Sequence, residues 1–338
     1  MKTISELENF MTRPSNELKR DLAKLDGDIM VLGVGGKMGP TLMRMIKRAL
    51  DEIGSDKRVI GVSRFSKGNL EKELQGYGME TIAADLLDDQ ALHSLPEVKN
   101  VIYMAGNKFG TVGNEHFTWA MNTYLPGRVA EKFKDSRIVS FSTGNVYPLT
   151  RISSSNCSED TPVNPVGEYA QSCLGRERIF TYFSHKNNTP MLMFRLNYAI
   201  DLRYGVLLEL AKQVNEGEAI DLTMGNVNVI WQGDANEYAV RSLLHCDSPP
   251  EILNITGPET LSVRWVAEEF AKRFNKKALF INEEDSKALL SNASKAHRFF
   301  GYPKVSVQEM INMIAVWVQS EGLTFNKPTH FQEREGAF

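Results

Sequence analysis

Residues 29–53 read IMVLGVGGKMGPTLMRMIKRALDEI, and this stretch decides the fold. It begins with a short run of apolar residues, which is typical of a buried strand. It ends with apolar residues three and four positions apart, which is typical of an amphipathic helix. Gly33, Gly36 and Gly39 lie between the two. A strand, a glycine-rich turn and a helix in this order predict a βα unit that can hold a phosphate group at the start of the helix.

The three glycines have separate expected roles. Gly33 lets the chain turn at the end of the strand, Gly36 lets a pyrophosphate approach the backbone, and Gly39 lets the helix pack close to the strand. Lys37 and Met38 lie in the same turn, so we expect both to contact a bound dinucleotide. The alternative is a tight turn that binds nothing.

The same alternation continues through the first two hundred residues. Strand-like runs recur, separated by helix-like stretches, at 58–64, 80–85, 100–106, 137–143 and 191–196. Strands that alternate with helices imply right-handed crossovers and a parallel sheet covered on both faces. The sequence therefore predicts an α/β fold, a Rossmann-type doubly wound parallel sheet.

Before and after this region the pattern differs. Residues 1–26 read as two short helices split at Pro14, with Ser15 as the N-cap of the second, and we interpret them as an N-terminal helical extension. Residues 27–200 form the predicted dinucleotide-binding Rossmann domain. The less regular residues 201–338 are expected to form a smaller, partly interleaved substrate-binding lobe that makes one wall of a cleft.

Composition excludes several classes of function. The chain has 39 Lys and Arg against 42 Asp and Glu, a net charge of −3, and no basic block, so we expect neither nucleic acid nor membrane as a partner. Its three cysteines are too scattered for a disulfide framework or a zinc site, so no metal is expected. No apolar run of about 18 residues and no signal peptide occur. We expect a cytoplasmic protein that binds small molecules.

The end of the second strand bears on which dinucleotide is bound. An acidic residue there accepts from the ribose 2′-hydroxyl of NAD, but this chain has Ser63 and Arg64, with Lys67 nearby. A hydroxyl and a cation suit a 2′-phosphate, which favours NADP over NAD. The alternative is that Arg64 is a solvated surface charge. Asp85, after the third strand, is placed either to accept from the adenine amino group or to cap a helix.

Together these features resemble the extended short-chain dehydrogenase/reductase family, the NAD-dependent epimerase/dehydratase group, over roughly residues 28 to 320. The motifs that carry the resemblance stand in the order the family places them. They are GVGGKMG at 33–39, AADLLD at 83–88, MAGNKFG at 104–110, Asn122, STGNVYP at 142–148, EDTPVNP at 159–165, EYAQS at 168–172, RLNYA at 195–199, GDAN at 233–236 and NITGPETLS at 254–262.

The resemblance implies roles for particular residues. Thr143 and Tyr169 fall where the family has its catalytic pair, in which a tyrosine moves the proton while a second hydroxyl holds the same substrate oxygen. Such a pair is chemically required, because hydride leaves a carbon only as a proton leaves its oxygen. The glycine turn, Ser63, Arg64 and Asp85 have already been named as cofactor contacts. The resemblance implies six more: Leu86, Ala105, Gly106, Lys108, Asn122 and Tyr169 itself.

One departure concerns catalysis. The family pattern is YxxxK, but Tyr169 is followed four residues later by Cys173. That lysine holds the nicotinamide ribose and lowers the tyrosine pKa, and a neutral cysteine does neither. Either another cation, such as Lys108, takes over part of the role, or redox cycling is weak. Cys173 is read as a small buried helix residue rather than a reactive thiol, and Lys108 is alternatively an exposed loop residue.

A second departure concerns the substrate. Nucleotide-sugar members carry an arginine where this chain has Val227 and Asn228, so a nucleotide sugar is not expected. Polar residues at the carboxyl ends of strands could contact a smaller carbohydrate, or could instead tie down a loop. These expected substrate contacts are Thr143, Asn145, Asn197, Tyr198, Arg203 and Tyr204.

The sequence thus predicts an NAD(P)-dependent oxidoreductase, epimerase or dehydratase acting on a small sugar, sugar acid or polyol. The rival hypothesis is a dinucleotide-binding protein with little catalysis, because the lysine is missing. By analogy with the family we expect a homodimer formed through the helices that follow Asn122 and Tyr169.

Overall fold

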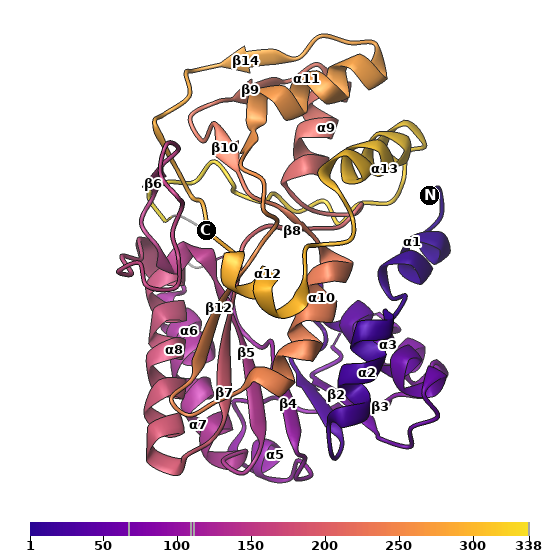
Figure 1. Cartoon of the computed structure of the whole chain (residues 1–338), viewed down its shortest axis with the longest axis vertical. Helices are drawn as coiled ribbons and strands as arrows, with labels where there is room; N and C mark the ends of the chain where they lie inside the picture. The colour runs from indigo at the N-terminus through magenta and orange to yellow at the C-terminus, as the bar shows by residue number, and fades with distance from the viewer. Residues whose placement is uncertain (67, 109, 111, 337–338) are drawn as a thin grey trace.

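A computed structural model describes residues 1–66, 68–108, 110 and 112–336, and its centre is a seven-stranded sheet (Figure 1). The strand order is β12-β7-β5-β4-β1-β2-β3, and every neighbouring pair is parallel. The strands are β1 (Ile29–Leu32), β2 (Val59–Ser63), β3 (Glu80–Ala83), β4 (Asn100–Tyr103), β5 (Arg137–Thr143), β7 (Met191–Leu196) and β12 (Glu251–Ile255). The order reverses between β1 and β4, which is where ligands bind in open parallel sheets. The predicted fold class is confirmed.

Helices cover both faces of this sheet because successive strand residues point to opposite sides. In β1, Ile29 and Val31 belong to one apolar core while Met30 and Leu32 belong to the other. The first core is completed by α2 (Asn16–Lys24), α3 (Gly39–Glu52), α10 (Gln232–Arg241) and α12 (Ser294–Phe300). The second is completed by α5 (Asp89–His93), α7 (Leu125–Lys132) and α8 (Gly167–Asn187). Burial on both faces explains the continuous apolar strands in the sequence.

Residues 115–132, which follow β4, form one continuous helical stretch of three parts. These are α6 (Glu115–Trp119), a π-helical turn η1 (Ala120–Tyr124) and α7. The wide turn directly precedes Pro126, which has no N–H to donate to the preceding turn. Asn122 lies in this turn and is fully buried. Such turns are frequent at functional sites.

A smaller cluster of elements lies above the carboxyl ends of the strands (Figure 1). Its helices α9 (Val206–Glu216), α11 (Val263–Phe274) and α13 (Val307–Gln319) pack against one another around a third apolar core. Its short strands pair two by two: β9 (Ala219–Asp221) with β14 (Leu279–Ile281), β10 (Asn226–Val227) with β13 (Leu261–Ser262), β11 (Ile230–Trp231) with β8 (Ala199–Ile200), and β15 (Lys287–Ala288) with β6 (Thr150–Arg151). The remaining α-helices are α1 (Ile4–Met11) and α4 (Leu70–Gly76), and two short 3₁₀ helices lie at η2 (Gly144–Val146) and η3 (Ser242–His245).

The N-terminal helices are more than an appendage. Their split at Pro14 and the Ser15 cap, which accepts from Leu18 N, are as predicted. However, Leu7 and Leu18 are completely buried in two different cores. Both helices are also tied to distant segments: Glu8 in α1 pairs with Arg203, and the hydroxyl of Ser15, the N-cap of α2, donates to Glu237. The predicted extension is therefore packed into the folded unit, which short-range periodicity does not reveal.

The helix α10 follows β11 without a loop, because β11 ends at Trp231 and α10 begins at Gln232. Every residue of α10 is buried, so its sequence lacks the polar face that marks most helices. Within the described ranges, no helix is long and apolar enough to cross a membrane, and no cluster of metal-ligating side chains is present.

Candidate active site

The glycine turn has the close contacts that its first and third glycines require. Gly33 has φ +88°, and a Cβ on it would lie 2.6 Å from the backbone N of Ala105. A Cβ on Gly39 would lie 2.2 Å from the carbonyl oxygen of Val34, in the turn just after β1. These separations are far shorter than any real Cβ contact, so both positions need glycine for packing.

Gly36 differs, because the protein itself leaves room beside it. A Cβ there would have its nearest contact, Gly33 O, at 3.5 Å, which is an ordinary distance. Packing therefore does not require glycine at this position, whereas a group bound against the backbone would. A turn with free space at its middle glycine and a helix start behind it fits the pyrophosphate of a dinucleotide.

A cleft of about 320 Å³ opens beside this turn. Among the predicted cofactor contacts, it is lined by Gly33, Gly36, Ser63, Arg64, Asp85, Leu86, Ala105 and Gly106. Sequence reasoning missed other lining residues, among them Gly35, Phe65, Leu70, Phe117 and Met121. Phe117 and Met121 come from the helical stretch after β4, where they look like ordinary core residues. The cleft thus joins the carboxyl ends of β1, β2, β3 and β4.

The side chains that bear on dinucleotide choice lie at this cleft. Arg64 is exposed at its rim and forms no hydrogen bond or ion pair with any described residue. Asp85 does not cap a helix: its Oδ1 accepts from Leu87 N at 3.0 Å, while Asp88 is the N-cap of α5. Lys67 lies outside the described residues. The alternative reading of Asp85 as a cap is therefore wrong.

The two expected catalytic hydroxyls meet at the carboxyl end of β5. Thr143 ends that strand and Tyr169 lies in the first turn of α8, where the Thr143 hydroxyl is near enough to favour a lower pKa of the tyrosine. The Thr143 hydroxyl also donates to Asn145 Oδ1 at 3.1 Å. Burial raises the pKa of Tyr169, and the positive charge of Arg176 acts in the opposite direction.

Cys173 occupies the position of the family's lysine, and it is buried. It is 1% exposed and packs in an apolar cluster with Val146 and Tyr147, against which Tyr169 also packs. Burial raises the pKa of its thiol, so it is a neutral packing residue rather than a nucleophile.

Lys108 approaches the tyrosine from another direction. Its Nζ lies 5.9 Å from the centre of the Tyr169 ring, and burial lowers the pKa of this amine to about 8. The lysine stands on the loop after β4, a long way in sequence from α8. The structure therefore brings a cation to the tyrosine although Cys173 does not supply one.

Sequence reasoning missed Arg176, which is 6% exposed and lies two helical turns after Tyr169. Its guanidinium donates to Phe141 O at 2.7 Å and to Asn122 Oδ1 at 2.8 Å. Asn122 in turn exchanges two 2.8 Å hydrogen bonds with the backbone of Asn107. Asn122 therefore anchors the loop that carries Lys108 and does not line the cleft. The seven-residue spacing on one helix face was the available signal.

A buried ion pair stabilises the wall behind the catalytic hydroxyls. Arg195 on β7 and Glu177 on α8 are each 4% exposed, with Nη2 and Oε2 2.6 Å apart. Ser142 and Tyr147 complete the network by hydrogen bonds to Glu177 and Arg195. Satisfied networks of this kind rigidify the elements they join, here β5, β7 and α8.

Of the expected substrate contacts, Asn197 and Asn145 lie beside Thr143. Asn197 is 2% exposed, and its Nδ2 has no hydrogen-bond partner among the described residues. Its Cγ would lie 3.2 Å from a Cβ placed on Gly144, the residue after Thr143. A buried amide without an acceptor is costly unless a ligand supplies one.

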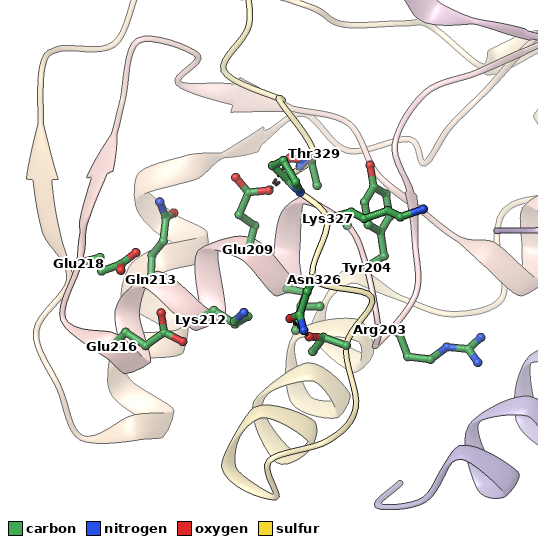
Figure 2. Close-up of a pocket in the computed structure, with 14 residues that line it drawn as sticks. Arg203, Tyr204, Glu209, Lys212, Gln213, Glu216, Glu218, Asn326, Lys327 and Thr329 are labelled. Carbon is green, nitrogen blue, oxygen red and sulfur yellow. Dashed lines mark hydrogen bonds between the residues drawn. The ribbon is translucent and has the colours of Figure 1, made fainter. Parts of the chain in front are cut away.

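Three other expected substrate contacts lie elsewhere. Arg203 forms ion pairs with Asp201 at 2.8 Å and Glu8 at 3.0 Å, and the hydroxyl of Tyr198 donates to Phe331 O at 3.5 Å. These two side chains hold loops, which is the alternative that the sequence left open. Arg203 and Tyr204 line a second cavity of about 350 Å³, which lies between α9 and the C-terminal segment (Figure 2). At this cavity the Thr329 hydroxyl donates a hydrogen bond to the carboxylate of Glu209.

Two predicted cofactor contacts in the glycine turn do not line the cleft. The side chain of Met38 packs in the core. Lys37 extends the other way, so that its Nζ donates to Ala199 O at 2.9 Å and lies 4.7 Å from the centre of the Tyr204 ring. Burial lowers its pKa to about 8. The Lys37 amine thus belongs to the side of the turn that faces the loop after β7.

The sequence profile described as "NAD dependent epimerase/dehydratase family" matches residues 29–248. No curated protein matches the chain.

Similar solved structures include Pal from Bacillus thuringiensis (TM-score 0.71, 17% identity, 87% of this chain and 99% of that one). They also include the UDP-glucose 4-epimerase of Thermus thermophilus in complex with NAD (TM-score 0.70, 18% identity, 86% and 99%). A third is the UDP-glucuronic acid 4-epimerase of Bacillus cereus with UDP-glucuronic acid and NAD (TM-score 0.69, 19% identity, 87% and 99%). At these identities the likeness supports the fold alone.

Proposed function

Because this chain belongs to the NAD-dependent epimerase/dehydratase family, we propose that it is an NAD(P)-dependent oxidoreductase, epimerase or dehydratase acting on a small sugar, sugar acid or polyol. One observation carries the proposal: Thr143 and Tyr169 lie together at the carboxyl end of β5, with Lys108 beside the tyrosine ring. This group adjoins the loops that line the glycine-turn cleft. It can therefore act on an oxygen whose carbon gives hydride to a bound nicotinamide.

The residues of the cleft fit a dinucleotide, which would supply the hydride acceptor. Gly33, Gly36 and Gly39 would hold its pyrophosphate against the start of α3. The family name and the bound neighbours both specify NAD, so they give no support to NADP. A preference for NADP rests only on Ser63 and Arg64, which line the cleft where NAD-selective proteins carry an acid.

In the proposed mechanism Tyr169 takes the proton from a substrate hydroxyl as hydride departs, and returns it in the reverse step. Thr143 donates to the same oxygen and fixes its position. Burial alone would keep Tyr169 protonated, because burial disfavours the phenolate. Lys108 and Arg176 oppose that effect, since a nearby positive charge stabilises the phenolate.

The proposed substrate carries no nucleotide. Val227 and Asn228 are buried where nucleotide-sugar members have an arginine. Asn228 is fully engaged in the fold, because its Nδ2 donates to Glu259 O at 2.9 Å and its Oδ1 accepts from Ser291 N at 2.8 Å. Arg203 is held by two carboxylates. These positions offer no cation for a diphosphate, although several structural neighbours are UDP-sugar epimerases.

The test is a screen of sugars, sugar acids and polyols for changes in nicotinamide absorbance, or for product formed without net redox. Tyr169→Phe should abolish conversion and leave dinucleotide affinity unchanged. Tyr182→Phe is the matched control, because Tyr182 lies on the same helix and is 58% exposed. Full activity in Tyr169→Phe would overturn the acid/base assignment.

The second candidate is a dinucleotide-binding protein with little catalysis. It is favoured by Cys173 in place of the lysine and by the raised pKa of Tyr169. The same screen separates the two candidates, because a silent binder would bind the dinucleotide by calorimetry and convert nothing.

We also propose a homodimer, formed through the surface of α6, α7 and α8, which lie on one side of the molecule (Figure 1). Large aromatic side chains are exposed on this stretch: Trp119 is 38%, Tyr124 60% and Tyr182 58% exposed. Light scattering would show a monomer for Tyr182→Glu if this surface pairs. A cytoplasmic location remains part of the proposal and is supported by three unpaired cysteines.

A further inference from the structure

The last described residues, 321–336, form neither helix nor strand, and they cross from α13 to the neighbourhood of β6 and α8 (Figure 1). Several contacts fix this segment along its length. Phe331 is completely buried in the core that α9, α11 and α13 surround. Thr329 donates to a carboxylate oxygen of Glu209 through its backbone N–H at 2.9 Å and its hydroxyl at 2.6 Å. Residues 321–336, the C-terminal strap, are therefore packed onto the rest of the fold.

Arg334 fixes the end of the strap. Its guanidinium pairs with Asp285 at 3.1 Å and donates to two backbone carbonyls, Lys287 O at 3.0 Å and Thr223 O at 3.2 Å. Lys287 begins β15, and the partner of β15 is β6, which lies in the chain shortly after Thr143. The strap thus holds the segment that pairs with the chain beyond one of the two expected catalytic hydroxyls.

The strap contacts α8 through two glycines whose backbones touch. Gly167 is the first residue of α8, two positions before Tyr169, and Gly336 is the last described residue of the strap. Their φ angles are +78° and +83°. A Cβ on Gly167 would lie 2.3 Å from Gly336 O, and a Cβ on Gly336 would lie 2.4 Å from Val166 O. Neither glycine can therefore gain a side chain unless the strap and the helix separate.

The first turn of α8 depends on contacts from outside the helix. Val166, the N-cap, has no polar side chain that could accept from the first N–H groups of the helix. The turn is also held by a hydrogen bond from Trp119 Nε1 to Glu168. Helix ends fray where such contacts are lost. Because Tyr169 lies in this turn, a movement of the turn would displace its hydroxyl from Thr143.

We infer that the C-terminal strap positions Tyr169 for catalysis, because its end contacts the first turn of α8 and holds the phenol beside Thr143. This inference rests on the proposed function, in which Tyr169 is the acid/base. The strap itself takes no part in the chemistry. Its effect can still be large, because a displacement of about 1 Å at a reacting group can lower a rate by about a hundredfold.

The experiment releases the strap in two independent ways. Gly336→Ala adds a Cβ against the start of α8. Gly54→Ala is its matched control, because Gly54 also has a positive φ, +66°, but no described atom lies within 4 Å of the added Cβ. Arg334→Met removes the contacts that fix the end of the strap. Arg264→Met is its control, because Arg264 forms a comparable ion pair with Glu284 at 2.7 Å.

Two kinds of measurement are made on the full chain. Hydrogen exchange by mass spectrometry needs no substrate. The amides of residues 171–174 report on the first turn of α8, because in an α-helix they donate to the carbonyls of residues 167–170. The kinetic constants kcat and KM are measured with the sugar, sugar acid or polyol that the screen identifies, and the affinity for NAD is measured by calorimetry.

We expect faster exchange of these amides in Gly336→Ala and Arg334→Met than in their controls. In both variants kcat should fall by about ten- to a hundredfold, while KM and the affinity for NAD stay close to those of the controls. Exchange or kcat equal to that of the control would overturn the inference, and so would an equal loss in KM and NAD affinity, which indicates general unfolding. If wild type converts no substrate, the proposed function fails, whereas faster exchange would still show that the strap holds the helix.

Discussion

Replacing Lys108 by methionine tests how this site works without the family's lysine. Methionine keeps the length and apolar stem of the side chain and removes only the charge. In the native protein the Lys108 Nζ lies 5.9 Å from the centre of the Tyr169 ring. A cation at this distance stabilises the phenolate, so its removal should raise the pKa of Tyr169.

The magnitude follows from that distance. Two unit charges about 6 Å apart interact by about 3 kcal/mol at an effective dielectric constant of about 20, which corresponds to about two pH units. The pH–rate profile of Lys108→Met should therefore move to higher pH by up to that amount. Because the pKa of Lys108 is itself about 8, the lysine loses its charge above that pH. Wild type and variant should thus differ most near neutrality and converge in alkali.

The assay is the initial rate of nicotinamide reduction as a function of pH, under saturating substrate. Lys99→Met is the control. Lys99 lies just before the amino end of β4, at the opposite end of the strand from the loop that carries Lys108. Coincident profiles for wild type and Lys108→Met would refute the role of Lys108 as the replacement cation. A fall in rate of equal size at all pH values would indicate a positioning effect instead.

Substitutions at two glycines of the turn should have different effects, one on dinucleotide binding and the other on the stability of the protein. Gly36→Val should abolish dinucleotide binding, measured by calorimetry, and leave the melting temperature unchanged. Gly39→Ala should lower the melting temperature in thermal unfolding, because the added Cβ would lie 2.2 Å from Val34 O. Arg64→Ala should weaken the affinity for NADP by roughly ten- to a hundredfold and leave the affinity for NAD unchanged. Equal affinities of the wild-type protein for NAD and NADP would disprove the preference for NADP. Cys173→Lys should destabilise the protein by on the order of 3 kcal/mol in urea unfolding without raising activity near neutrality, because the new charge would be buried beside Lys108 and Arg176.

Local patterns predicted most of the framework. The glycine turn and six of the seven parallel strands follow from short apolar runs and fixed spacings, which depend on neighbours in the chain. The seventh strand, β12, comes from the region expected to form the smaller lobe, and its place beside β7 was not predicted. Thr143 and Tyr169 could be placed because each follows a recognisable element, the fifth strand and the start of a helix. The two residues then lie close together because the carboxyl ends of parallel strands share one edge of the sheet.

What the sequence did not predict depends on contacts between distant segments. Lys37 was expected to contact the dinucleotide, but a flexible side chain can leave a turn in either direction, and here Ala199 and Tyr204 hold it. Arg203 was expected at the substrate, yet Glu8 in the first helix neutralises it. Arg176 was missed because, apart from its seven-residue spacing from Tyr169, nothing in the local sequence indicates that it is buried.

A crystal structure of the protein with bound dinucleotide tests the central claim most directly. We predict that the pyrophosphate lies against Gly36, that the nicotinamide ring faces the Tyr169 hydroxyl, and that Lys108 lies at the nicotinamide ribose. A dinucleotide bound with its nicotinamide turned away from Tyr169, or with Lys108 far from the ribose, would contradict it.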